Sequence, residues 1–143
     1  MEEKIIGITQ TIFVIAMVVV LLFAGCISNE EMQNEGKNIV ENVSMKIYGQ
    51  NWTISYTNIT TANTTVYALL LECASHYDFA VKATYWGSYD SILIDSINGT
   101  ENGENGHYWQ YYVNGTLANV GCDKYVLHNN DVVEWKFEQP AWP

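Results

Sequence analysis

Two alternating stretches near the C-terminus most constrain what this chain can fold into. Residues 108–113 and 132–137 place large apolar side chains at every second position, which is the period of two expected of β-strands. The dipeptide Asn114-Gly115 follows the first stretch and predicts a tight hairpin turn, since both residues readily adopt positive φ. We expect the rings either to fill a core or to form a platform for a ligand. The apolar side chains on one face are Trp109, Tyr111, Val113, Val133, Trp135 and Phe137.

The preceding residues predict further strands and one helix. Residues 43–48 and 52–56 alternate and predict an antiparallel pair, and 79–85 and 91–97 predict two more short strands. We expect an exposed connection between 51 and 65. A threonine N-cap at 64–65 precedes an apolar stripe with helical spacing, formed by Val66, Leu69, Leu70 and Cys73. The order β-β-α-β-β-β predicts an α+β fold with one helix laid on a sheet.

Composition excludes one class of partner. The formal net charge is −10, with sixteen acidic residues against six lysines and no arginine. Because phosphate binding needs clustered Lys or Arg, nucleic acid is not an expected partner, and an anionic membrane surface is disfavoured for the same reason. The length leaves room for one domain after the N-terminal segment.

Residues 1–27 predict a membrane-targeting segment. An uncharged apolar run ends in Leu22-Phe23-Ala24-Gly25-Cys26, which resembles the lipobox of prokaryotic lipoproteins, in which the cysteine is lipidated after cleavage. The alternatives are an uncleaved anchor helix and a pilin-type leader. In all three cases the rest of the chain lies on the extracellular side of the cell membrane. A lipid or an N-terminal helix attaches the chain to that membrane. Residues 28–42 are polar and acidic and predict a flexible tether.

Asn-x-Ser/Thr sequons are more frequent than the composition predicts. Together with the lipobox, they indicate the cell surface of a prokaryote that glycosylates its proteins, and we expect an archaeon. The alternative is a surface that is simply rich in Asn and Thr, with Asn114 serving only the geometry of its turn. The candidate glycosylation sites are Asn42, Asn51, Asn58, Asn63, Asn98 and Asn114.

Several short motifs between residues 43 and 138 occur together in one known family. They are Thr-Thr-Val-x-Ala-Leu-Leu at 64–70, Ser-Ile-Asn-Gly at 96–99, Tyr-Trp-Gln-x-x-Val-Asn-Gly at 108–115, Asp-x-Tyr at 123–125 and Asn-Asp-Val-Val at 130–133. In this combination the domain resembles the transcobalamin-like C-terminal domain family. The resemblance implies a β-grasp, ubiquitin-like fold, with residues 139–143 as a tail. In vertebrate cobalamin carriers, a domain of this kind closes over cobalamin from one side while a helical barrel supplies the other. We expect no counterpart of the barrel in this chain, so the resemblance makes a corrinoid a candidate ligand rather than a resident cofactor.

The side chains opposite the Trp109 face predict a ligand platform. Aromatic rings beside an amide suit flat amphipathic ligands such as corrins, glycans or the edge of a partner protein. The candidate ligand-binding residues are Tyr108, Gln110, Tyr112, Trp86 and Tyr89. We expect the Trp109 face itself to be core.

Two cysteines remain if Cys26 is lipidated. Outside the cell, Cys73 and Cys122 predict a disulfide between the helix and the C-terminal half of the domain. The alternative is two buried free thiols.

No catalytic or metal-binding motif stands out. His76, His107 and His128 lack ligand spacing, and the chain has no nucleophile elbow and no phosphate loop. We therefore expect no enzyme activity, no metal and no cofactor. The sequence predicts a cell-surface lipoprotein that displays a non-catalytic binding domain for a corrinoid or a surface partner. The alternative is a structural or adhesive cell-envelope domain with no small-molecule ligand.

Overall fold

The computed structural model describes residues 38–140. The predicted lipobox at Cys26 and the whole of segment 1–27 lie outside these residues, as do most of the tether and the end of the tail. Within residues 38–140, no helix is both long enough and apolar enough to span a bilayer.

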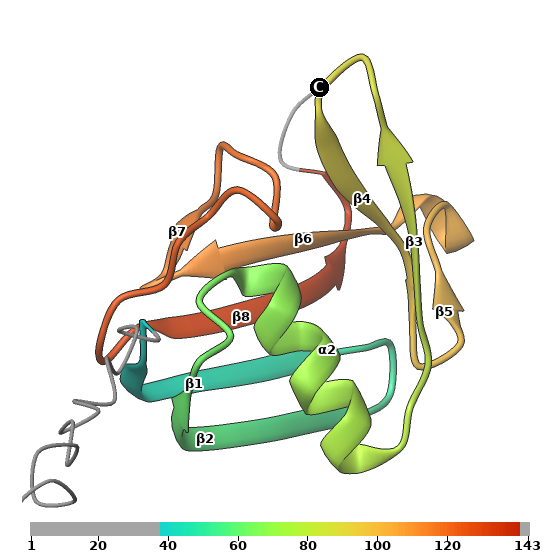
Figure 1. The fold of residues 1–143 in the computed structure, drawn as a ribbon. Coiled ribbons are helices and arrows are strands. Elements are labelled where there is room, and N and C mark those ends of the chain that lie inside the picture. The colour runs from blue at the N-terminus through green and yellow to red at the C-terminus, as the bar shows by residue number, and fades with distance from the viewer. Residues whose placement is uncertain (1–37, 141–143) are drawn as a thin grey trace, which may run out of the picture. The chain divides into compact units, whose positions relative to one another are not determined.

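Five strands form a mixed sheet in the order β2-β1-β8-β6-β7 (Figure 1). The last strand, β8, lies in its centre, parallel to β1 and antiparallel to β6. The bounds are β1 Val40–Tyr48, β2 Thr53–Thr61, β6 Tyr108–Val113, β7 Thr116–Leu117 and β8 Val132–Glu138. A parallel central pair flanked by two antiparallel hairpins is a β-grasp-like arrangement, and the α+β prediction is confirmed.

The alternating stretches bury the face that the sequence predicts. All six apolar side chains of the Trp109 face are buried. Cross-strand ring contacts join β6 to β8, with centroids 5.2 Å apart both for Trp109 and Phe137 and for Tyr111 and Trp135. The rings of this face are therefore core.

Helix α2 (Val66–Tyr77) crosses the sheet over β1, β2 and β8 (Figure 1). Thr65 caps it, since its Oγ1 accepts a hydrogen bond from the Ala68 N–H at 3.1 Å. The helix ends at Asp78, which adopts a left-handed conformation with φ of 55°. Its buried stripe is the predicted one, Val66, Leu69, Leu70 and Cys73.

Strand β2 is longer than the alternating pattern suggests. It continues to Thr61, through much of the segment expected to be an exposed connection. Glu72 of the helix accepts hydrogen bonds from Tyr56 at 2.9 Å and from Thr61 at 2.5 Å, which ties the extra length of the strand to α2. A side-chain network therefore extends a strand whose apolar alternation ends earlier.

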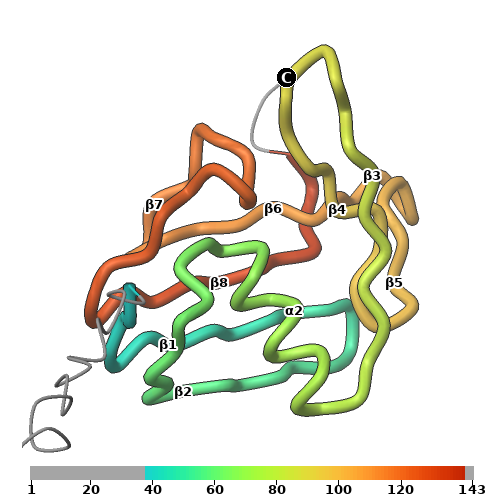
Figure 2. Tube along the Cα trace, viewed as in Figure 1, coloured from blue at the N-terminus to red at the C-terminus, as the bar shows by residue number. Residues whose placement is uncertain are grey.

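A second sheet has the order β3-β4-β5. Its strands are β3 Val81–Trp86, β4 Ser91–Ile97 and β5 Thr100–Glu101, followed by a 3₁₀ turn, η1, at Glu104–Gly106. A register shift between the pairs Lys82↔Ser96 and Ala83↔Ile94 inserts Asp95 as a bulge in β4. The β3–β4 hairpin rises away from the larger sheet, as the tube trace shows (Figure 2), and every residue from 82 to 90 is exposed.

The predicted disulfide is absent, because Cys73 and Cys122 are both buried free thiols. The reason is that Cys122 lies beside the start of α2, whereas Cys73 lies in its second half. The Cys122 carbonyl accepts a hydrogen bond from the Tyr67 N–H at 2.9 Å, so Cys122 lies beside the first turn of α2. Cys73 lies six residues, or about 9 Å, further along the axis. Disulfides need Cα atoms within about 7 Å of each other.

Candidate binding groove

A groove of about 180 Å³ lies between strand β4 and the outer edge of strand β6. Ile92, Leu93 and Gly121 also line a neighbouring hollow of about 340 Å³, whose other walls include Trp86 and Tyr89. The two depressions therefore form one continuous apolar surface. The groove itself is lined by Ile92, Leu93, Ile94, Trp109, Gln110, Tyr111, Leu117, Ala118, Val120, Gly121, Cys122 and Trp135.

One amide side chain holds the two walls together at the end of the groove near β5. The Asn102 Nδ2 donates to the Ile94 carbonyl at 2.6 Å, and the Asn102 Oδ1 accepts from the Trp109 N–H at 2.8 Å. Asn102 thus bridges β4 and β6, and these contacts fix the distance between the two sheets at this point.

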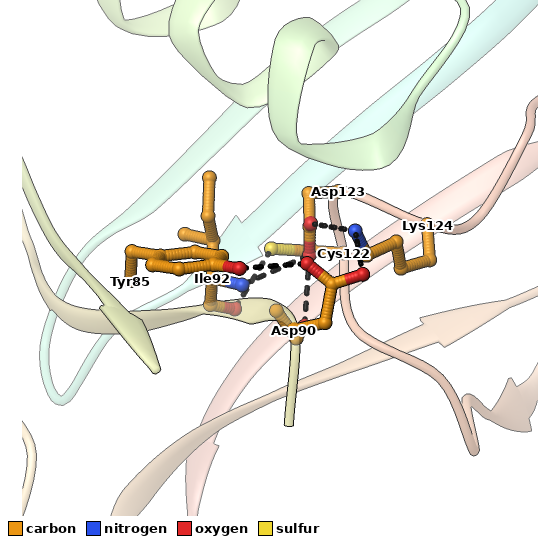
Figure 3. A network of polar contacts seen from close by, with 7 residues as sticks. Tyr85, Asp90, Ile92, Cys122, Asp123 and Lys124 are labelled. Atoms are coloured by element: carbon orange, nitrogen blue, oxygen red, sulfur yellow. Dashed lines mark hydrogen bonds and ion pairs between the residues drawn. The ribbon is translucent and has the colours of Figure 1, made fainter. Parts of the chain in front are cut away.

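A carboxylate network holds the opposite end (Figure 3). The Asp123 Oδ1 accepts hydrogen bonds from the Ser91 hydroxyl at 2.8 Å and from the Ile92 N–H at 3.0 Å. Lys124 lies 3.3 Å from both Asp123 and Asp90. These bonds join the loop after β7 to the start of β4.

The pKa of Asp123 lies below its usual value. Burial of the carboxyl group is the largest single influence and raises the pKa. Hydrogen bonds from Ile92, Ser91, its own backbone and Lys124 favour the charged form and together outweigh burial. Asp123 is therefore an ionised structural group at neutral pH.

The thiol in the groove is not activated. Burial, followed by the charge of Asp123, raises the pKa of Cys122 to about 12. Its sulfur lies 3.7 Å from the Ile92 carbonyl, to which the thiol donates. A thiol with this pKa stays protonated, whereas cysteine nucleophiles react as thiolates.

Gly121 allows the loop to approach β4 closely. A Cβ atom at this position would lie 1.7 Å from the Ser91 Oγ and 2.8 Å from the Asp123 Oδ1. Neither Asn102 nor Gly121 is predicted from the sequence, because their contacts arise between segments that are distant in the chain. Only the Asp-x-Tyr motif at 123–125 marks this region in advance.

Two buried polar atoms within residues 38–140 have no hydrogen-bond partner there, the Gln110 Oε1 and the Trp135 Nε1. Gln110 is 5% exposed and Trp135 is 2% exposed, and both residues line the groove. Most buried polar side-chain atoms in proteins are paired, so the acceptor on Gln110 and the donor on Trp135 are exceptions within the described residues.

The five predicted platform residues do not form one exposed patch. Trp86 is 48% exposed and Tyr89 is 75% exposed, with ring centroids 6.0 Å apart beside the groove. Gln110 lines the groove but is buried, which corrects the expectation that its side chain is exposed. Tyr108 is exposed and Tyr112 is half-buried, and neither lines the groove or the hollow.

Tyr112 belongs to a separate contact. Its hydroxyl donates to Glu138, and the Lys136 Nζ lies 4.3 Å from the centre of its ring. The hydrogen bond, followed by burial and nearby acidic charge, raises the pKa of Tyr112 to about 12.

All six sequon asparagines are exposed. The Asn114 side chain donates to Asp131 at 2.8 Å and accepts from the Val132 N–H at 2.9 Å, which fits a structural role in its turn. Asn42 and Asn63 also donate side-chain hydrogen bonds. Within residues 38–140, the side chains of the remaining three, Asn51, Asn58 and Asn98, make no recorded hydrogen bond.

The histidines occupy separate places. His76 packs against Tyr56 and Tyr77, His107 bonds to the Asn105 carbonyl, and His128 lies 3.7 Å from Asp131. Within residues 38–140, no three His, Cys, Asp or Glu side chains are grouped so that they could hold a metal ion.

The fold and groove define a small α+β domain with a β-grasp-like sheet. Residues 65–139, which are 75 of the 143 in the chain, match the family described as a domain of unknown function, DUF4430. The chain belongs to this family. No curated protein matches it.

Two solved structures share the fold. One is a candidate metal-binding protein from Ruminococcus gnavus, with 14% identity and a TM-score of 0.53, over 70% of this chain and 98% of that protein. The other is haptocorrin in complex with Cbi, with 20% identity and a TM-score of 0.54, over 71% of this chain. The chain matches 26% of the length of haptocorrin. At these identities the likeness shows the fold alone.

Proposed function

We propose that this protein is a non-catalytic binding module, displayed on the outer side of a cell membrane and anchored through Cys26. Its binding surface is the groove between β4 and β6 with the adjoining Trp86 and Tyr89. The observation that carries this proposal is the continuous apolar surface of the groove and the adjoining hollow, with the exposed Trp86 and Tyr89 rings at its edge.

The chemistry of the groove supports binding rather than catalysis. The one thiol among its lining residues is Cys122, whose raised pKa keeps it protonated. No His, Asp, Glu or Lys side chain is among the described lining residues. The surface offers shape, apolar area and a few hydrogen-bonding groups, which are the properties of a recognition site.

A corrinoid is the first small molecule to test. The haptocorrin structure that shares this fold contains Cbi, and the chain's own motifs resemble those of cobalamin carriers. The Trp86 and Tyr89 rings give the groove an aromatic rim on which a flat ring system can rest.

The test is a titration of cyanocobalamin into the full-length protein in detergent micelles, followed by calorimetry. We expect saturable binding that Trp86→Ala weakens about tenfold, the effect of removing one aromatic contact of moderate strength. The matched control is Leu71→Ala, which truncates an exposed apolar side chain on α2 that lines neither depression. No saturable binding up to millimolar cyanocobalamin would exclude corrinoid capture by this protein.

One observation favours a second role in adhesion. The β3–β4 hairpin exposes nine consecutive residues, 82–90, which include Tyr85, Trp86 and Tyr89. Exposed aromatic groups on a projecting hairpin suit contact with another surface protein. In this role the domain would have no small-molecule ligand. Replacing the three aromatic residues with Ser should then abolish cell–cell or cell–matrix attachment without unfolding the domain.

A further inference from the structure

Strand β2 forms one edge of the larger sheet and lacks most of the features that protect edge strands. In the order β2-β1-β8-β6-β7, its single neighbour among the described strands is β1. It is nine residues long, and residues 49–65, which contain it, include no Asp, Glu, Lys or Arg. A long, uncharged edge strand presents backbone N–H and C=O groups with which a strand of another chain can pair. The β2 edge is therefore a site at which two copies of the chain could associate.

The other three edge strands each carry a protective feature. β5 and β7 are only two residues long, and β5 contains Glu101. β3 is six residues long and carries Lys82, whose side chain is exposed. Short length and charged side chains are common means by which proteins keep sheet edges from pairing with each other. Within residues 38–140, β2 is thus the one edge strand that is both long and uncharged.

A bulge interrupts β2 near its middle. The register against β1 shifts between Tyr56 and Ile59, where β2 has one residue more than its partner. Asn58 lies in this bulge and adopts a left-handed conformation with φ of 57°. The Tyr77 hydroxyl protects a second point of the strand, since it donates to the Ser55 carbonyl at 2.8 Å. Both features act at single points, so they protect the edge only in part.

Three of the six sequons lie along this same strand. Asn51 stands two residues before its first residue, Asn58 lies in its bulge, and Asn63 stands two residues after its last. The sequons are therefore concentrated on the edge strand that has neither short length nor charge to protect it.

The side chains of these asparagines are not equally free. The Asn63 Nδ2 donates to Glu72 at 2.7 Å. Asn58 is exposed, and only its backbone N–H is engaged, by the Ser44 hydroxyl at 3.4 Å. The Nδ2 atom, to which N-linked sugars attach, thus makes no recorded hydrogen bond at Asn58 within residues 38–140. Asn58 is also at the centre of the strand, where one bulky group reaches both halves of the edge.

We infer that Asn58 carries an N-linked glycan, which keeps the β2 edge from pairing with a second copy of the chain. This inference rests on the proposed function, because the glycan is attached on the outer side of the membrane. A host enzyme transfers it from a lipid-linked phosphate donor. The bond between the sugar C1 and the phosphate oxygen breaks, and its electron pair stays on the phosphate. A bond forms from C1 to the Asn58 Nδ2, which loses one proton. Because a glycan is bulky and hydrated, it blocks the approach of a second strand.

The test compares Thr60→Val with Thr60→Ser in the full-length protein, produced in the membrane of a host that N-glycosylates its proteins. Thr60 is exposed on β2 and completes the sequon of Asn58. Valine removes the hydroxyl that the sequon requires but stays β-branched, whereas serine keeps the sequon. Mass spectrometry of the peptide that contains Asn58 should find a glycan in the wild type and in Thr60→Ser, and none in Thr60→Val.

Self-association is measured by sedimentation velocity in detergent micelles. At about 0.15 M salt, exposed charges are screened beyond about 8 Å, so the net charge of −10 does not by itself keep the copies apart. We expect the dissociation constant for self-association to be at least tenfold lower for Thr60→Val than for the wild type and Thr60→Ser. Equal dissociation constants for the two variants would overturn the protective role of the glycan.

A matched pair of lysines locates the interface. Thr57→Lys, added to Thr60→Val, places a charge on an exposed residue of β2 and should restore the monomer. Ser88→Lys places the same charge in the exposed turn between β3 and β4 and should not restore it. Equal effects of the two lysines would show that the copies do not meet at the β2 edge.

Labelling of intact cells separates this inference from the proposed function. An amine reagent that does not cross membranes should label the protein where the domain lies outside, since Lys82 is exposed. Labelled protein with an unmodified Asn58, in cells that glycosylate their own proteins, would refute the inference and leave the proposed function standing. If the reagent does not label the protein, the proposed location is wrong and the inference fails with it.

Discussion

At the scale of single residues, Asp123 and Gly121 set the width of the groove at the end opposite Asn102. Asp123 joins the loop to β4 through hydrogen bonds, and Gly121 lets that loop lie against Ser91 without a side chain between them. Neither residue contributes apolar surface to the core. Their effect on stability and binding comes from geometry and charge, so it can be tested by small substitutions.

Replacing Asp123 with Asn should destabilise the fold by about 1–2 kcal/mol at pH 7, since hydrogen bonds to a charged acceptor become bonds to a neutral one. The folded-state pKa of Asp123 is below the unfolded value of about 3.9. Its ionised form therefore stabilises the fold above that pH, and the contribution is lost as the pH falls through the folded-state pKa. Urea unfolding should show the difference between wild type and Asp123→Asn shrinking below about pH 4. Asp90→Asn, on the exposed side of the same network, should leave stability unchanged. A constant difference at all pH values would contradict this account.

Gly121→Ala should destabilise the fold by about 1–3 kcal/mol, because the new methyl group would overlap the Ser91 hydroxyl and force the loop away from β4. Gly87→Ala is the control, since its nearest contact would be an ordinary 3.8 Å. Thermal unfolding measures both. If the two variants had equal melting temperatures, the close approach of the loop would not constrain the fold.

At the scale of elements, periodicity predicts what lies within one strand or helix. The buried faces of β6 and β8 and the stripe of α2 follow from apolar spacing, because each pattern is local. The extension of β2 to Thr61 does not, since Thr61 donates a hydrogen bond to Glu72 of a helix that follows later in the chain. The spacing of the groove walls depends on Asn102, which bridges β4 and β6. Sequence patterns place Gln110 among the candidate ligand-binding residues on an exposed platform, whereas the structure buries its side chain.

The cap of helix α2 should carry a measurable share of its stability. Thr65→Ala removes the acceptor for the Ala68 N–H and should cost about 1 kcal/mol. Thr64→Ala is a matched control, since no side-chain hydrogen bond of Thr64 is recorded in the described part of the chain and its carbonyl bond to Leu127 is kept. Urea unfolding followed by circular dichroism compares the two variants. Equal losses would show that the cap contributes nothing specific.

A thiol titration can check that Cys73 on α2 and Cys122 in the loop beside the groove are not joined by a disulfide. In a Cys26→Ser protein purified without reductant, an aromatic disulfide reagent should titrate two thiols after denaturation. It should titrate almost none in the native state, because Cys73 and Cys122 are buried and burial raises the pKa of each to about 12. Denatured protein that yields no thiols until it is reduced would show that the two cysteines do pair.

At the scale of the whole molecule, the first and last strands of the domain pair inside the larger sheet, whereas the groove lies near its edge beside β6. β1 begins at Val40, inside the segment predicted to be a tether, and β8 closes the sheet in the centre by pairing with β1 and β6. The sheet can form only when the last strand meets the first, so residues 40–138 act as one folding unit. The groove lies at the edge of this sheet, between β6 and the second sheet.

The anchor is the last feature that can be tested at this scale. If the lipobox at 22–26 is processed, the mature protein begins at Cys26, carries a lipid there and enters the detergent phase on Triton X-114 partitioning. Cys26→Ser should block processing, so mass spectrometry should find the uncleaved chain, still held in the membrane by its apolar segment. Ala24→Ser keeps a small residue at the cleavage site and serves as the control. An uncleaved, unlipidated wild-type chain in a host that processes lipoproteins would instead identify residues 1–27 as a plain anchor helix. The binding domain would face the same side of the membrane in either case, since both anchors leave the acidic tether outside.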